Sequence, residues 1–182
     1  MLDINREKNI PTAFSTLILL ICAVLLRQIY LAKRSTRFSG YWRGLSIIFF
    51  GMGLDECLII HEHISVFLDP LTHNRGAFYY SWVVLGLLFV LVFVASYAHF
   101  IVRLSTKTRR RFLIAGAVYL FGVLGMELIS GYYISGHGLD NRPTLALLNG
   151  IEETAEMLGI SLFIRALLMY LKAEIPVHSS RS

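Results

Sequence analysis

Charged residues are scarce in this chain: 16% of its 182 residues are Asp, Glu, Lys or Arg, and 55% are hydrophobic. Such a composition excludes most soluble domains and is typical of a membrane protein. Cysteine is nearly absent, and because Cys22 and Cys57 both lie in apolar segments, no disulfide framework is predicted. The sequence also has no phosphate-binding loop, no dinucleotide fingerprint and no nucleophile–base–acid arrangement. Catalytic residues therefore cannot be assigned from motifs.

The apolar residues form five long segments, each able to cross a hydrocarbon core of about 30 Å as a helix. These segments are residues 12–30, 41–67, 78–102, 112–134 and 145–171. The first is too long in its apolar core for a signal peptide, and basic residues follow it rather than precede it. No repeat, low-complexity tract or long linker divides the chain. We therefore predict an all-α, polytopic membrane helix bundle of about five transmembrane helices, forming a single integral membrane domain over residues 1–182.

Basic residues alternate between the predicted loops. The loops after the second and fourth spans hold only Arg75 and Arg142, respectively. The loops after the first and third spans, with their borders, hold Arg27, Lys33, Arg34, Arg37, Arg43, Arg103, Lys107, Arg109, Arg110 and Arg111. The positive-inside rule places these basic loops in the cytoplasm, the N-terminus outside and the C-terminus inside. We expect an integral membrane protein whose net charge of +5 reflects topology, not nucleic-acid binding.

Acids and histidines interrupt three of the apolar spans. They are Asp55, Glu56, His61, Glu62 and His63 in the second span, Glu127 in the fourth, and Glu152, Glu153 and Glu156 in the fifth. An ionisable side chain at mid-membrane depth costs at least about 2.5–3.5 kcal/mol. A metal, shared protons or a water-filled path would offset that cost.

The depths of these acids coincide. At 1.5 Å per residue, Asp55, Glu127 and Glu152 fall in about the same layer, on the outer side of the membrane midplane. His61 and His63 come out nearer the outer surface, so the sequence predicts a polar cluster that opens outward.

Helical spacing groups the side chains further. In a continuous second helix, Asp55 and Glu62 would share one face, and Glu56 and His63 an adjacent face. On the fifth helix a three–four ladder is formed by Asn149, Glu152 and Glu156. Glycines flank the acids and would let the helices approach closely.

Carboxylates and imidazoles drawn from several helices suit Fe, Zn or Mn. The Glu-x-x-His pattern of di-metal bundles is absent. Calcium is possible because it prefers oxygen ligands, and copper because methionines and Cys57 lie near the acids. The predicted ligands of a divalent metal ion are Asp55, Glu62, His63, Glu127, Glu152 and Glu156. The residues predicted to support these ligands or relay protons are Glu56, His61, Asn149 and Glu153.

Plainer interpretations stand beside the metal site. Glu127 alone fits a protonated acid hydrogen-bonded to a neighbouring helix, and the whole set fits a structural polar network. His61 and His63 fit interfacial residues that face water. An aromatic belt at the outer interface is indicated by Tyr79, Tyr80, Trp82, Tyr132 and Tyr133.

The motifs resemble those of a known group. Asp55-Glu56 to His61-Glu62 reads DExxxxHE, Gly125-Met126-Glu127 reads GxE, and residues 152–159 read EExxEMxG. Together they resemble a family of uncharacterised bacterial multi-pass membrane proteins, from the second span to the fifth. The resemblance implies a bacterial inner-membrane protein with a shared helical bundle and the acids as its core motif, and it implies no activity.

Three classes of function remain. The first is a membrane metalloprotein, and an enzyme of this class would act on an apolar substrate from the outer side. The second is a proton or cation carrier that uses the acids as relay sites, although the inner half of the bundle lacks matching acids. The third is a non-catalytic subunit of a larger membrane complex. The expected partners are membrane lipids, with other membrane subunits or a second copy of the chain as further candidates. The residues favour the metalloprotein.

Overall fold

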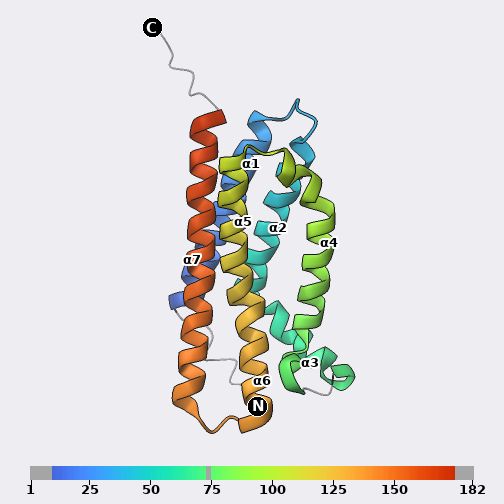
Figure 1. The fold of residues 1–182 in the computed structure, drawn as a ribbon, viewed down its shortest axis with the longest axis vertical. Coiled ribbons are helices and arrows are strands. Elements are labelled where there is room, and N and C mark those ends of the chain that lie inside the picture. The colour runs from blue at the N-terminus through green and yellow to red at the C-terminus, as the bar shows by residue number, and fades with distance from the viewer. Residues whose placement is uncertain (1–9, 73–74, 175–182) are drawn as a thin grey trace.

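The computed structural model describes residues 10–72 and 75–174, and these residues are almost entirely helical (Figure 1). No strand occurs among them, so the predicted all-α fold class is confirmed. The elements in order are α1 (Ile10–Ala32), α2 (Ser39–Leu58), α3 (Ile60–Thr72), the 3-10 turn η2 (Gly76–Phe78), α4 (Trp82–Arg103), α5 (Thr106–Leu120), the π-helical turn η3 (Phe121–Met126), α6 (Glu127–His137) and α7 (Arg142–Glu174).

Four helices are long and apolar enough to cross a membrane: α1, α4, α7 and the continuous rod α5–η3–α6. The pair α2–α3 passes the same test only when taken together, because it is bent by 77° at its break. The bundle therefore offers four spans, or five with the bent pair, in agreement with the predicted number.

The bend between α2 and α3 corrects a prediction. Ile59 adopts a left-handed conformation, with φ 55° and ψ 43°, and its amide bonds to the Asp55 carbonyl as a helix cap. The second span is thus not one continuous helix. The shared faces predicted for Asp55 with Glu62, and for Glu56 with His63, are wrong because the chain changes direction between the members of each pair.

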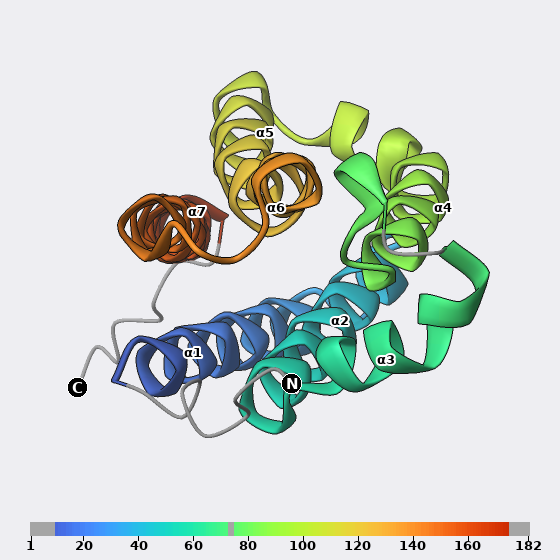
Figure 2. The ribbon, with the colours of Figure 1, turned by 90° about the horizontal axis from the view of Figure 1, so that it is seen from below.

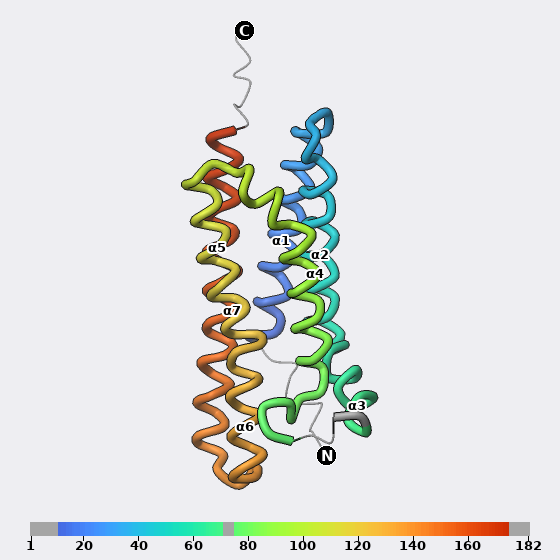
Figure 3. The backbone as a smooth tube through the Cα atoms, turned by 45° about the vertical axis from the view of Figure 1, so that its right-hand side comes forward, coloured from blue at the N-terminus to red at the C-terminus, as the bar shows by residue number. Residues whose placement is uncertain are grey.

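Successive spans run in opposite directions (Figures 1 and 3). The α1–α2 and α4–α5 turns lie at one end of the bundle, which we call the basic end after the arginines and lysines of those turns. The α3–η2 region and the α6–α7 turn lie at the opposite end. Seen end-on, α1 and α2 lie side by side, α7 lies beside the α5–α6 rod, and α4 stands at the flank (Figure 2).

An aromatic core holds the basic end together. The Trp42 ring packs against Phe100 at 5.0 Å, Phe112 at 6.2 Å and Tyr170 at 4.8 Å between ring centroids. These four side chains come from α2, α4, α5 and α7, so one buried indole joins four helices. Elsewhere α4 packs little, because only 6% of its apolar stretch is buried.

Two glycines bring α7 against the α5–η3 rod. A Cβ atom at Gly159 would lie 2.6 Å from the Tyr119 amide nitrogen, and one at Gly122 would lie 2.9 Å from the Glu156 amide nitrogen. Real Cβ atoms do not approach backbone so closely, so only glycine permits this packing. The contact at Gly122 sets the acids of α7 beside the π-helical turn.

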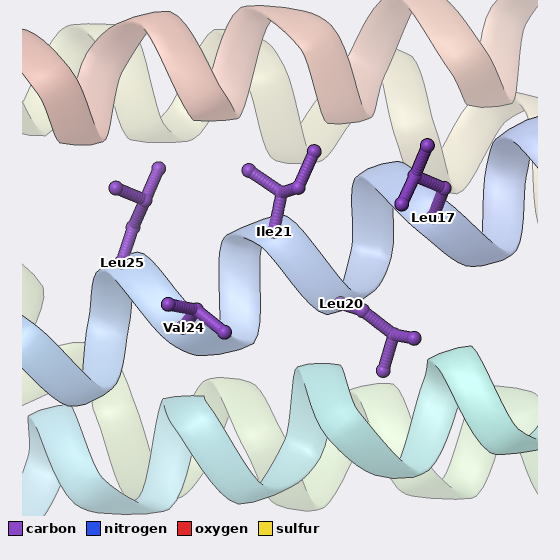
Figure 4. Close-up of a pocket in the computed structure, with 5 residues that line it drawn as sticks. All are labelled: Leu17, Leu20, Ile21, Val24 and Leu25. Carbon is purple, nitrogen blue, oxygen red and sulfur yellow. The ribbon is translucent and has the colours of Figure 1, made fainter.

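A hollow of about 290 Å³ beside α1 is wholly apolar. Figure 4 shows its lining: Leu17, Leu20, Ile21, Val24 and Leu25. Ile21 and Leu25 point toward α7 and Leu20 toward α2 (Figure 4). With no polar group in its lining, this hollow suits lipid chains and is separate from the acids.

We predict that Gly159→Ala lowers the free energy of unfolding by about 1–3 kcal/mol, because the methyl group pushes α7 away from the Tyr119 backbone. Reversible unfolding in mixed detergent micelles measures the change.

Gly116→Ala is the matched control on α5, because nothing lies within 4 Å of a Cβ atom built there. The higher helix propensity of alanine should leave stability unchanged or raise it by up to about 1 kcal/mol. Equal losses in both variants would contradict the close approach of α5 and α7.

Candidate functional site

The bend at Ile59 brings a carboxylate and an imidazole from two neighbouring helices into contact. The Asp55 Oδ1 atom accepts a hydrogen bond from the His61 backbone amide at 2.9 Å, and its Oδ2 atom lies 3.0 Å from His61 Nδ1. In a continuous helix, His61 would lie about 120° around the axis from Asp55 and about 9 Å along it. The bend therefore lets both carboxylate oxygens of Asp55 contact His61 across the break.

Trp82 connects this pair to Glu127. The indole Nε1 donates a hydrogen bond to Glu127 Oε1 at 3.2 Å, and the Trp82 ring lies 5.2 Å from the His61 ring. Trp82 begins α4 and Glu127 begins α6, directly after the π-helical turn. A π turn holds one more residue than an α turn, so it rotates the side chains that follow, and such turns are frequent at functional sites.

The acids of α7 complete a cluster drawn from three spans. Glu156 lies within electrostatic range of Glu56, His61, Glu127 and Glu153. Tyr80, which precedes α4, lies within range of Glu62, Glu127 and Glu152. We call this set the acid cluster, and it comprises Asp55, Glu56, His61, Glu62, Glu127, Glu152, Glu153 and Glu156. The bundle thus brings together acids that lie up to about a hundred residues apart in the chain.

Two of the predicted residues are exposed, unlike the members of the acid cluster. His63 is exposed, and its Nδ1 atom lies 2.7 Å from the Ile59 carbonyl oxygen. Asn149 is exposed on the first half of α7. The bend carries His61 onto the Asp55 carboxylate, whereas the His63 ring contacts the backbone at the break itself.

The sequence analysis missed several polar contacts around the cluster. It placed Trp82 in an aromatic belt, whereas the indole hydrogen-bonds to Glu127. The hydroxyl of Ser81 donates to Asp69 Oδ1 at 2.8 Å and so ties the start of α4 to α3. The Ser130 hydroxyl is buried and has no hydrogen-bond partner among the described residues. Ser130 follows Glu127 by three residues, so spacing alone could have placed both on one helical face.

The carboxylates and the imidazole of the acid cluster are suitable ligands for a divalent metal ion. Their side chains, however, are not arranged as a metal site in this structure. Among residues 10–72 and 75–174, no three His, Cys, Asp or Glu side chains stand close enough together to hold a metal ion. Asp55 is occupied by His61, and Glu127 by Trp82. A metal would therefore require carboxylates to turn away from these partners.

The fold and the site define a polytopic helical bundle with acids gathered between its spans. The chain belongs to the family of a domain of unknown function, DUF8692, whose profile matches residues 1–171. No curated protein and no solved structure matches the chain. The family match agrees with the resemblance to an uncharacterised family, and its description carries no activity, ligand or location.

We predict that Asp55 and His61 are energetically coupled. A double-mutant cycle with Asp55→Asn and His61→Gln should give a coupling energy of about 1.5–3 kcal/mol, the value for a hydrogen bond to a charged group. Unfolding in mixed micelles supplies the four free energies.

The pair Lys33–Glu174 at the basic end is the internal comparison. Its atoms lie 2.9 Å apart at the surface, and the Glu174 side chain is 44% exposed, so its coupling should stay below about 1 kcal/mol. Additive effects of Asp55→Asn and His61→Gln would contradict the structure of the break.

Proposed function

We propose that this integral membrane protein binds a cation in the acid cluster, and that a divalent metal ion is the occupant. The observation that carries the proposal is the excess of carboxylates: seven acids from three spans lie within electrostatic range of His61, Tyr80 or one another, and His61 is the one histidine among them. Like charges gathered at low dielectric repel one another strongly, and a bound cation removes that repulsion. Fe, Zn and Mn are favoured because carboxylates and an imidazole form the donor set.

The proposed ligands follow from the placement of the side chains. Glu127 and Glu156 come from different spans and lie within electrostatic range of each other and of His61. We therefore assign the carboxylates of Asp55, Glu62, Glu127, Glu152 and Glu156 as the pool of ligands, with His61 in place of His63. Binding of a cation would break the hydrogen bond between Trp82 and Glu127 and weaken the one between His61 and Asp55. The bound ion would supply charge neutralisation, and no catalytic residue is assigned.

The proposed location is the bacterial inner membrane, with the N-terminus outside and the C-terminus in the cytoplasm. The placement of both basic turns at one end of the bundle supports this orientation. The acid cluster lies toward the other end, so it would open outward. Lipids would surround α4, because only 6% of its apolar stretch is buried.

The test is elemental analysis of the full chain purified in mild detergent without chelator. We expect one or two equivalents of a single divalent metal, and a loss of most of it in Glu127→Gln and in Glu156→Gln. Each substitution keeps the shape of the side chain and removes its charge, so the loss reports on the charge of the cluster.

Glu174→Gln is the control, because it removes a carboxylate at the basic end, remote from the cluster. This variant should keep the full metal content. Folded wild-type protein without metal, including after incubation with Fe, Zn or Mn, would overturn the metal site.

A second candidate, a proton or cation carrier, is favoured by the broken span. Discontinuous membrane helices expose backbone groups at ion sites of transporters, and the α2–α3 break lies directly beside Asp55 and His61. The acids would then pass a cation or proton along the cluster.

We predict that proteoliposomes containing the chain dissipate an imposed pH gradient if this second function is present. Glu127→Gln should slow the dissipation at least about ten-fold, whereas Glu174→Gln should not, because relay through an intramembrane acid needs its ionisable group. A rate equal to that of protein-free liposomes would exclude the carrier.

A further inference from the structure

A second hollow, shallow and wide open to the surroundings, lies at the basic end of the bundle, away from the acid cluster. It has a volume of about 290 Å³ and is lined by Arg37, Gly40, Tyr41 and Tyr97. Arg37 comes from the α1–α2 turn, Gly40 and Tyr41 from the first turn of α2, and Tyr97 from the second half of α4. The hollow therefore sits where the apolar spans end and the basic turns begin.

The walls of this hollow are held in place by aromatic contacts. The Tyr97 hydroxyl donates to the Tyr41 carbonyl oxygen at 3.4 Å, and the two rings meet edge to face at 5.4 Å. Tyr41 also stacks on the buried Phe100 at 5.0 Å. The Tyr97 hydroxyl lies against the α2 backbone at Gly44. These contacts fix two tyrosine rings beside one arginine.

The charge around the hollow is almost entirely positive. Glu174 is the one acid that the structure describes at this end, and it pairs with Lys33. Arg37 is exposed and has no ion-pair partner in residues 10–72 and 75–174. Other cations of the same end are Arg34, Arg43, Arg103, Lys107 and Lys172. The field at the hollow therefore attracts anions.

We propose that this hollow binds the phosphate headgroup of an anionic phospholipid. A guanidinium group binds phosphate through paired hydrogen bonds, and tyrosines at a membrane interface combine a polar edge with an apolar ring. The exposed apolar surface of α4 continues from Tyr97 along the membrane, so an acyl chain would find a surface beside the headgroup. Basic pockets between membrane helices are known to bind such headgroups.

The lipid, not free phosphate, is the proposed ligand. Free phosphate would use Arg37 alone, whereas a phospholipid would also use the apolar surface of α4. The neutral lipid phosphatidylcholine has the same chains and phosphate with an added cation, which the basic end would repel. The proposal therefore requires both a net negative headgroup and acyl chains.

The experiment is native mass spectrometry of the full chain in detergent, titrated with phosphatidylglycerol or phosphatidylcholine. We expect phosphatidylglycerol to bind at least about ten-fold more tightly. Arg37→Gln should weaken that binding about five-fold, the effect of one basic side chain near an anionic headgroup. Gly40→Leu should weaken it as well by filling the hollow, and nothing within 4 Å of a Cβ atom at Gly40 obstructs the substitution.

Arg43→Gln is the matched control, because Arg43 is exposed in the first two turns of α2, at the same end of the bundle, and does not line the hollow. It should change the affinity less than two-fold. Equal weakening by Arg43→Gln and Arg37→Gln would overturn the site in favour of diffuse attraction. Inorganic phosphate at about a ten-fold molar excess over the lipid should not displace it. Complete displacement at that excess would overturn the phospholipid as the ligand.

Discussion

The structure depends on one constraint: several carboxylates have to be kept inside an apolar bundle. Each alone costs several kcal/mol of solvation when it leaves water. The bundle meets this cost with polar partners at defined points. His61 folds back onto Asp55, and the Trp82 indole reaches Glu127 across helices. Both contacts lie where a helix changes its course: at the break after Leu58, at the start of α4, and at the π-helical turn before Glu127.

The two ends of the bundle have different physical tasks. At the basic end, Trp42 packs against rings from three other helices, and this core contains no carboxylate. Toward the other end, packing depends on glycines at positions 122 and 159, which leave room for backbone rather than for side chains. A rigid aromatic core therefore fixes the helix directions, and the close glycine contacts place the acids of α7 against the π-helical turn. The aromatic core and the glycine contacts together therefore bring acids that are distant in the sequence into one region of the bundle.

The apolar runs predicted the fold well because span length depends only on the thickness of the hydrocarbon core. Helical rise alone predicts that acids from three spans share a layer, and Trp82, which contacts both His61 and Glu127, links two of these spans. The break at Ile59 could not be predicted, because a β-branched residue rarely adopts positive φ and neither Gly nor Pro marks the site. The contact of His61 with Asp55 follows from that break. Trp82 was assigned to an aromatic belt because composition cannot tell an interfacial indole from one that bonds to a carboxylate.

The left-handed residue and the π turn are both unfavourable local structures, and both adjoin the acid cluster. Such conformations persist where surrounding contacts over-determine them. At Ile59 those contacts are the cap to the Asp55 carbonyl and the two bonds from His61 to the Asp55 side chain. Asp55 thus holds the break with its backbone and its side chain at once. A cation that drew the Asp55 carboxylate away from His61 would remove two of these three bonds, so binding in the cluster and the angle between α2 and α3 are linked through a single residue.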